Sequence, residues 1–230
     1  MTFPIPTAGP TGSGRAAATK RPSVLVPARI RPAAITIGAF GVVLVIVQIV
    51  NSLTSYQLVS TLGIQPRTLG GLWGVLAAPL LHNGWGHLAA NIVPLLIFGF
   101  LILVSRWQQF VAVTVLVWLV SGIGVWITGP SGHVIVGAST LVFGWLAFLV
   151  LRGFFSRHGA QIVLGVLLLA MWGGIFWGLL PGKEGISWQG HLFGALGGAL
   201  AAFLVAKADG PRRKAVTAGA GAGPALPSAG

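Results

Sequence analysis

The chain has 230 residues, of which 55% are hydrophobic and only 7% are charged, and its mean hydropathy is +0.89. About a quarter of the residues of a soluble domain are charged, so this composition excludes a water-soluble globular protein and indicates an integral membrane protein. The absence of cysteine excludes disulfide bonds and thiolate metal sites.

The N-terminal segment, residues 1–32, is rich in proline, glycine, alanine and threonine and contains five basic residues. It lacks the hydrophobic stretch and the small-residue cleavage site of a signal peptide. A segment of this composition cannot bury enough apolar surface to fold, so we expect a disordered basic tail.

Six hydrophobic segments follow, each close to the roughly 20 residues that a helix needs to cross the hydrocarbon core. The connection between the first two is apolar but interrupted by glycine and proline, and we expect it to lie partly buried and partly in the interface. Residues 208–230 resemble the N-terminal segment and predict a second basic tail, which leaves residues 33–207 as a six-helix membrane domain. The predicted spans are 33–52, 87–104, 107–128, 135–151, 160–180 and 188–206.

The lysine and arginine residues predict the orientation of these spans. With six spans, twelve of the fourteen basic residues share one side, and only Arg67 and Lys183 lie on the other. Basic residues accumulate on the cytoplasmic side of membrane proteins, so both termini are expected in the cytoplasm. Topology and contact with anionic lipid then explain the net charge of +12, and a nucleic-acid partner is not expected.

Polar residues inside a membrane are costly and mark functional sites. Here they occur near the starts of the second, fourth and sixth spans, namely His87 and Asn91 on one helical face, then Ser139, then His191. All three spans run from outside to inside, so these side chains lie within about two turns of the outer surface. We therefore expect the four groups to meet at one depth.

Each of these residues also has an ordinary structural explanation. A single serine in a membrane helix usually bonds a backbone carbonyl or packs against a neighbour. A histidine near a helix end usually lies in the interface, and an asparagine there often caps or bridges helices. The convergence of four such groups from three helices favours a functional site.

The four side chains meet the chemical needs of a serine hydrolase. A serine hydroxyl requires a base to become a nucleophile, and histidine is the usual one. Asparagine, histidine and the Ser139 amide are able to donate hydrogen bonds to an oxyanion. The chain has only two carboxylates, Glu184 in an outer loop and Asp209 in the inner tail, and neither lies within a predicted span. We therefore expect a Ser139–His191 dyad without an acidic third member.

Small and aromatic residues follow Ser139 and His191 closely in the sequence. Gly194 and Gly198 follow His191 on its helical face, and they would let the sixth helix approach a neighbour closely. Phe143 lies one turn after Ser139 on the same face, where its ring is placed to pack against His191.

The sequence resembles the rhomboid family of intramembrane serine proteases. The resemblance covers residues 33–207 and rests on three motifs in family order. They are His82-x4-His87-x3-Asn91 on the second span, Gly137-x-Ser139 within "GASTLVFG" on the fourth, and His191-x2-Gly194-x3-Gly198 within "GHLFGALGG" on the sixth.

The resemblance implies roles for these residues and no metal or cofactor. Ser139 would be the nucleophile and His191 the general base. The oxyanion donors would be His87, Asn91 and the Ser139 amide. The supporting residues would be His82, Gly137, Phe143, Gly194 and Gly198.

The resemblance also implies an all-α, six-helix fold in a bacterial plasma membrane, a cavity open to the outer side, and cleavage of single-span membrane proteins near the outer end of their helix. Two features depart from the family: Thr140 replaces the usual glycine, and the Trp-Arg pair of the long outer connection is absent.

Two alternatives remain open. One is an inactive rhomboid-like protein that binds membrane clients, and the other is a transporter or metal-binding protein that uses His82, His87 and His191. The sequence indicates no oligomeric state.

Overall fold

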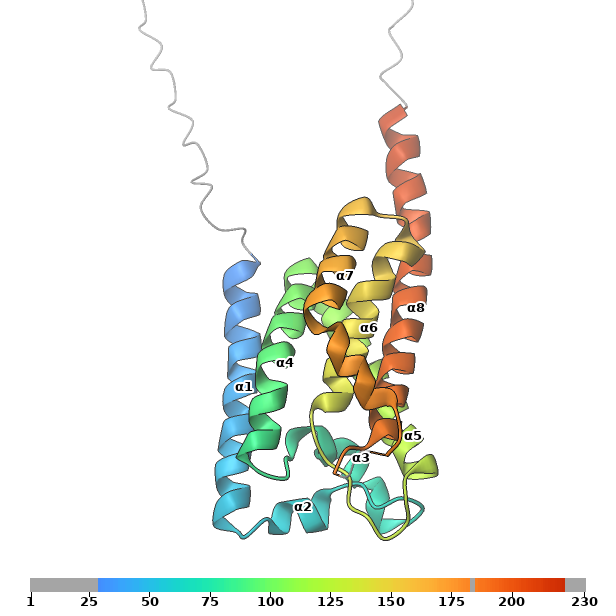
Figure 1. The fold of residues 1–230 in the computed structure, drawn as a ribbon. Coiled ribbons are helices and arrows are strands. Elements are labelled where there is room, and N and C mark those ends of the chain that lie inside the picture. The colour runs from blue at the N-terminus through green and yellow to red at the C-terminus, as the bar shows by residue number, and fades with distance from the viewer. Residues whose placement is uncertain (1–28, 183–184, 222–230) are drawn as a thin grey trace, which may run out of the picture.

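The structure, a computed structural model, describes residues 29–182 and 185–221. Within them the chain is a bundle of helices whose long members run roughly side by side (Figure 1), and the predicted all-α fold with six spans is confirmed. The six long helices are α1 (Ile30–Leu53), α4 (Trp85–Ser105), α5 (Trp107–Thr128), α6 (Ser139–Ser156), α7 (Gly159–Trp172) and α8 (Trp188–Gly221). The 3₁₀ segment η3 (Gly173–Leu179) extends α7, so that this span reaches Leu179.

Several helix boundaries differ from the sequence prediction. α1 begins at Ile30, within the predicted N-terminal tail, and α6 ends at Ser156, five residues past the predicted end. α6 begins at Ser139 rather than at residue 135, because Ile135 exchanges backbone hydrogen bonds with Ile64 at 2.9 and 3.0 Å and is held extended. α8 continues to Gly221, past residue 207 where a tail was expected; the alanines between 215 and 220 favour helix. Residues 1–28 and 222–230, the rest of the two predicted tails, lie outside the described residues.

The long connection between α1 and α4 folds across one end of the bundle (Figure 1). It is anchored on α5, where the Trp118 indole N–H donates to the Val75 carbonyl at 2.7 Å. Val75 and Ala78 are buried, whereas Leu69 and Trp73 are exposed, as expected for a segment partly in the interface. It contains α2 (Gln57–Leu62), η1 (Gly70–Leu72), α3 (Gly74–Ala77) and η2 (Ala78–Leu80).

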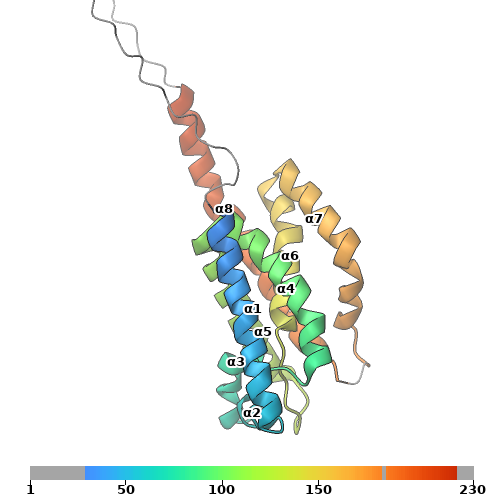
Figure 2. The ribbon, with the colours of Figure 1, turned by 90° about the vertical axis from the view of Figure 1, so that its left-hand side faces the viewer.

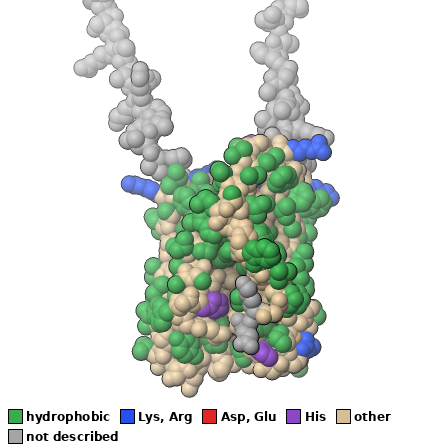
Figure 3. Space-filling model, viewed as in Figure 1, with side chains coloured by type: hydrophobic (Ala, Val, Ile, Leu, Met, Phe, Trp, Pro, Cys, Tyr) green, Lys and Arg blue, Asp and Glu red, His purple; other side chains and the backbone are tan. Residues whose placement is uncertain are grey.

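α6 is the central helix of the bundle. Leu141, Trp145 and Phe148 on it are fully buried, and it packs against α4, α5, α7 and α8. Figure 2 shows α7 at the edge of the bundle, and most of its surface is exposed to the surroundings. The hydrophobic side chains cover the middle of the face in Figure 3, while most of its lysine and arginine side chains lie at the end where α1 begins.

α6 and α8 are in close contact through glycines. A Cβ atom on Gly198 would lie 1.9 Å from the Gly144 carbonyl oxygen, and one on Gly194 would lie 2.3 Å from the Thr140 carbonyl oxygen. Only glycine permits so close an approach of two backbones. The contact brings the first turns of α6 and α8 together at the end of the bundle that α2 and α3 cover.

Candidate active site

Ser139 and His191 lie side by side at that end of the bundle. Ser139 is the first residue of α6, and His191 is in the first turn of α8. The Ser139 Oγ atom is 3.0 Å from the His191 Nε2 atom, a hydrogen-bond distance. The glycine contact between the helices therefore joins two side chains 52 residues apart.

The second ring nitrogen of His191 also makes a hydrogen bond. Its Nδ1 atom lies 2.9 Å from the carbonyl oxygen of Gly178 in η3. A carbonyl oxygen only accepts hydrogen bonds, so Nδ1 carries the proton, and the lone pair on Nε2 of the neutral ring faces the serine hydroxyl. No third group was predicted from the sequence; the structure supplies a backbone carbonyl in that position.

Aromatic rings pack against the face of the His191 imidazole. The Phe143 ring stacks on it with a centroid distance of 4.0 Å and an interplanar angle of 9°. Phe176 in η3 meets Phe143 edge to face at 6.0 Å. The end of the fifth span thus contacts His191 directly through Gly178 and indirectly through Phe143.

His87 and Asn91 face the same cavity as the Ser139–His191 pair. This cavity of about 320 Å³ is also lined by residues of α4, η3 and the segments that precede α6 and α8. The His87 Nδ1 atom accepts the Asn83 backbone N–H at 3.3 Å, which leaves its Nε2 atom protonated. Asn91 donates one amide hydrogen to the His87 carbonyl at 2.8 Å, and its other amide hydrogen has no partner among the described residues.

Gly137 shapes the wall between His87 and Ser139. Its φ angle is +129°, a value that residues with a Cβ rarely adopt. A Cβ atom here would also lie 2.8 Å from the His87 Nε2 atom. Both requirements explain glycine at the first position of the Gly-x-Ser motif.

His82 lies behind the cavity rather than in its lining. It is fully buried, and its Nε2 atom accepts the Ala138 backbone N–H at 3.3 Å, next to Ser139. Its own carbonyl accepts a hydrogen bond at 3.1 Å from the Asn51 side chain in α1. Asn51 was not among the site residues predicted from the sequence, although a polar residue at the end of the first span is a signal that could have found it.

Burial makes the protonation of His82 a source of pH-dependent stability. Removal from water, with a smaller contribution from the neighbouring His87, lowers the pKa of His82 from 6.5 to about 4. The unfolded chain therefore binds more protons than the folded chain between these pH values. The free energy of unfolding should fall by up to about 3 kcal/mol as the pH drops from 6.5 to 4.

Thermal unfolding in detergent at several pH values checks this prediction. A His82→Asn variant should be less stable than the parent near pH 7 and should lose less stability on acidification. His133→Asn, which changes an exposed histidine at the same end of the bundle, is the control and should follow the parent curve. An unchanged acid response in His82→Asn would refute the assignment.

Carboxylates are absent from the described surroundings of the pair. Glu184 lies outside the described residues, and Asp209 lies at the other end of the helices, where it pairs with Arg106 and Arg152. Among the residues that the structure describes, no three His, Cys, Asp or Glu side chains are grouped in a way that could hold a metal ion.

Comparison with protein families identifies the fold around this pair. The model of the Rhomboid domain matches residues 69–208, more than half of the chain. The chain belongs to the rhomboid family. It is thus a multi-pass membrane protein of a family of intramembrane proteases whose substrates are membrane proteins.

Relatives with similar sequences are found in bacteria. The chain is 41% identical to uncharacterized protein Rv1337 of Mycobacterium tuberculosis, over 93% of this chain and 91% of that protein. It is 40% identical to uncharacterized protein ML1171 of Mycobacterium leprae, over 78% and 73% of the two chains. A more distant relative is the "Putative rhomboid protease YdcA" of Bacillus subtilis, with 28% identity over 59% of this chain and 68% of that one.

In this rhomboid, Thr140 takes the place of the usual glycine at the contact of α6 with α8. Its carbonyl faces Gly194, and its Cγ2 methyl group lies beside Gly190, where a Cβ atom would be 3.1 Å away. Its hydroxyl is buried and has no hydrogen-bond partner among the described residues. Small residues on α8 thus provide the space that the β-branched side chain occupies.

Proposed function

We propose that this rhomboid is an active serine endopeptidase that cleaves peptide bonds of membrane proteins with Ser139 as nucleophile and His191 as general base. The observation that carries the proposal is the 3.0 Å contact between Ser139 Oγ and the unprotonated Nε2 of His191. Because the other nitrogen is bound to Gly178, the base is already in the tautomer that accepts a proton.

The reaction begins when Ser139 Oγ attacks the carbonyl carbon of the scissile bond and its proton passes to His191 Nε2. The carbonyl oxygen becomes an oxyanion, for which His87 Nε2–H, the free amide hydrogen of Asn91 and the Ser139 backbone N–H are the donors. His191 then gives its proton to the leaving nitrogen, and an acyl group remains on Ser139. Water, deprotonated by His191 Nε2, then attacks the acyl carbon, and Nε2 returns the proton to Ser139 Oγ as the ester bond breaks and the acid leaves.

The surroundings of the pair suit the imidazolium that forms in each step. The Gly178 carbonyl accepts a hydrogen bond from Nδ1, and the face of Phe143 lies parallel to the ring. Both interactions strengthen when the ring becomes positive. These neutral groups take the part that a carboxylate plays in a triad, and we expect a slower enzyme than a soluble triad protease.

The substrates proposed are single-span membrane proteins, cut near the outer end of their helix. A second hollow of about 480 Å³ adjoins the cavity, shares His87 and Ser187 with it, and extends to the loop around His133. An unwound substrate segment has a route to Ser139 through it. The distribution of basic residues supports cytoplasmic termini and a site that opens to the outer side of a bacterial plasma membrane.

Covalent labelling by a fluorophosphonate tests this function directly. We expect the protein in liposomes to form one adduct, on Ser139, and to cleave a single-span reporter in the same preparation. Ser139→Ala should lose both properties, whereas Ser121→Ala, which changes a buried serine in α5, should keep both. A folded parent protein that binds the reporter but neither reacts nor cleaves would support the inactive, client-binding alternative.

A further inference from the structure

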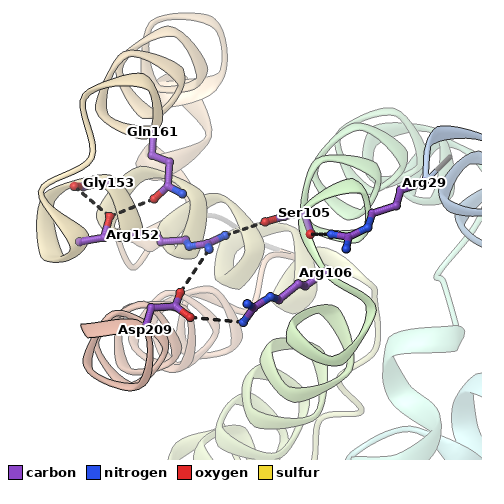
Figure 4. A network of polar contacts seen from close by, with 8 residues as sticks. Arg29, Ser105, Arg106, Arg152, Gly153, Gln161 and Asp209 are labelled. Carbon is purple, nitrogen blue, oxygen red and sulfur yellow. Dashed lines mark hydrogen bonds and ion pairs between the residues drawn. The ribbon is translucent and has the colours of Figure 1, made fainter. Parts of the chain in front are cut away.

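The helix ends opposite the candidate active site carry a cluster of arginines. Figure 4 shows this basic end, which consists of Arg29, Ser105, Arg106, Arg152 and Asp209. Arg106 and Arg152 contact the two oxygens of Asp209 at 3.3 and 3.6 Å. Arg152 also donates to the Ser105 hydroxyl at 3.0 Å, and Arg29 donates to the Ser105 carbonyl at 2.8 Å.

Hydrogen-bond donors outnumber acceptors in the basic end. The cluster contains three guanidinium groups and one carboxylate, the only one among the described residues, which leaves a formal charge of +2. Each guanidinium has five N–H groups, and Arg29 uses one of them on a backbone carbonyl. The cluster therefore retains capacity for an anion with several oxygen acceptors.

A cavity lies beside the two more exposed arginines. It has a volume of about 250 Å³ and lies between the start of α1 and the junction of α4 with α5. Half of its lining is polar (Arg29, Thr36, Arg106 and Gln108) and half is apolar (Pro32, Ala33, Leu103 and Trp107). This mixed lining fits an amphiphile better than a fully hydrated ion.

A buried side chain without a partner lies in the adjoining hollow. This second hollow, of about 480 Å³, shares Arg106 and Gln108 with the first and is also lined by Gln109. Gln109 is only 6% exposed, and neither its amide oxygen nor its amide nitrogen has a hydrogen-bond partner among the described residues. A buried amide normally finds partners, so this one indicates a ligand group that both donates and accepts, such as a hydroxyl.

We propose that the basic end binds an anionic phospholipid with a hydroxyl-bearing headgroup. The phosphate lies between Arg29 and Arg106. Because both amide atoms of Gln109 are enclosed in the structure, its side chain turns toward the hollow that shares Arg106 to meet the headgroup hydroxyls. Trp107, half exposed at the rim, is a typical interfacial residue, and exposed Ile35 and Val111 offer apolar contact to the acyl chains. Basic pockets between membrane helices are known to select such headgroups.

Native mass spectrometry of the protein in detergent tests the proposal without reference to proteolysis. The probes are phosphatidylglycerol and phosphatidylcholine with identical chains. We expect retention of phosphatidylglycerol by the parent protein and a loss of affinity of about tenfold or more in Arg29→Gln, since a charge-assisted hydrogen bond is removed. Arg157→Gln, at the same end of the bundle but outside both hollows, should bind like the parent.

A second variant separates the headgroup from the charge. Gln109→Leu should still bind phosphatidylmethanol, which carries the same charge without a headgroup hydroxyl, but should lose the preference for phosphatidylglycerol. Equal retention of phosphatidylcholine, or an equal loss in Arg157→Gln and Arg29→Gln, would overturn the proposal. Displacement of the lipid by millimolar glycerol phosphate would also overturn it, because the site would then serve a soluble phosphate compound.

Discussion

Replacement of His191 by alanine is expected to cost as much proteolytic activity as replacement of Ser139, and removal of both should cost no more. Each single change should lower cleavage by at least about a thousandfold, because neither group acts without the other. The reason is the 3.0 Å contact through which the proton leaves Ser139 Oγ. Initial rates of reporter cleavage in liposomes, measured for both single variants and the double variant, check this expectation.

The control for these variants is His158→Ala, which changes an exposed histidine at the opposite end of the helices. It should cleave at the rate of the parent protein. A double variant whose loss equals the product of the two single losses would show that Ser139 and His191 act independently. That result would contradict the dyad while leaving the fold intact.

Valine in place of Gly198 is expected to separate α6 from α8 and thereby to slow catalysis. A Cβ atom at this position would lie 1.9 Å from the Gly144 carbonyl oxygen, so the helices must move apart. A displacement of about 1 Å at the reacting atoms lowers rates by about a hundredfold. Overpacking should also destabilise the protein by about 1–3 kcal/mol, measured as a lower thermal unfolding temperature.

Gly38→Val in α1 is the matched control, because a Cβ atom at Gly38 meets nothing within 4 Å. It should leave both cleavage and unfolding temperature close to those of the parent. A Gly198→Val protein with full activity would refute the view that backbone contact between these helices aligns Ser139 with His191.

Much of the site could be predicted because hydropathy and the spacing of polar residues can be read from neighbouring positions in the chain. Hydrophobic length indicated the six spans, and the position of each polar residue near a span start indicated its depth. Ser139, His191, His87 and Asn91 line one cavity in the structure, as their common depth had suggested. Their catalytic roles remain proposals for the experiments above.

Other features had no sequence signal. Every residue has a carbonyl, so nothing distinguished the one of Gly178 that binds His191. Asp209 was expected in a flexible tail, yet it lies on α8 and pairs with Arg106 and Arg152. Both contacts join segments that are distant in the chain, and only packing decides which ones meet.

The sequence by itself determined the membrane-spanning class of this protein, its six helices and the four polar groups that share one end of them, because hydropathy and helical spacing depend on neighbouring residues alone. The tertiary structure decided the start of α6 at Ser139, the tautomer of His191 and the support of Ala138 by His82 and Asn51. These three features depend on backbone groups in segments that are distant from one another in the chain. The contact of Ser139 with His191 likewise requires that the glycines of α6 and α8 bring these two helices together.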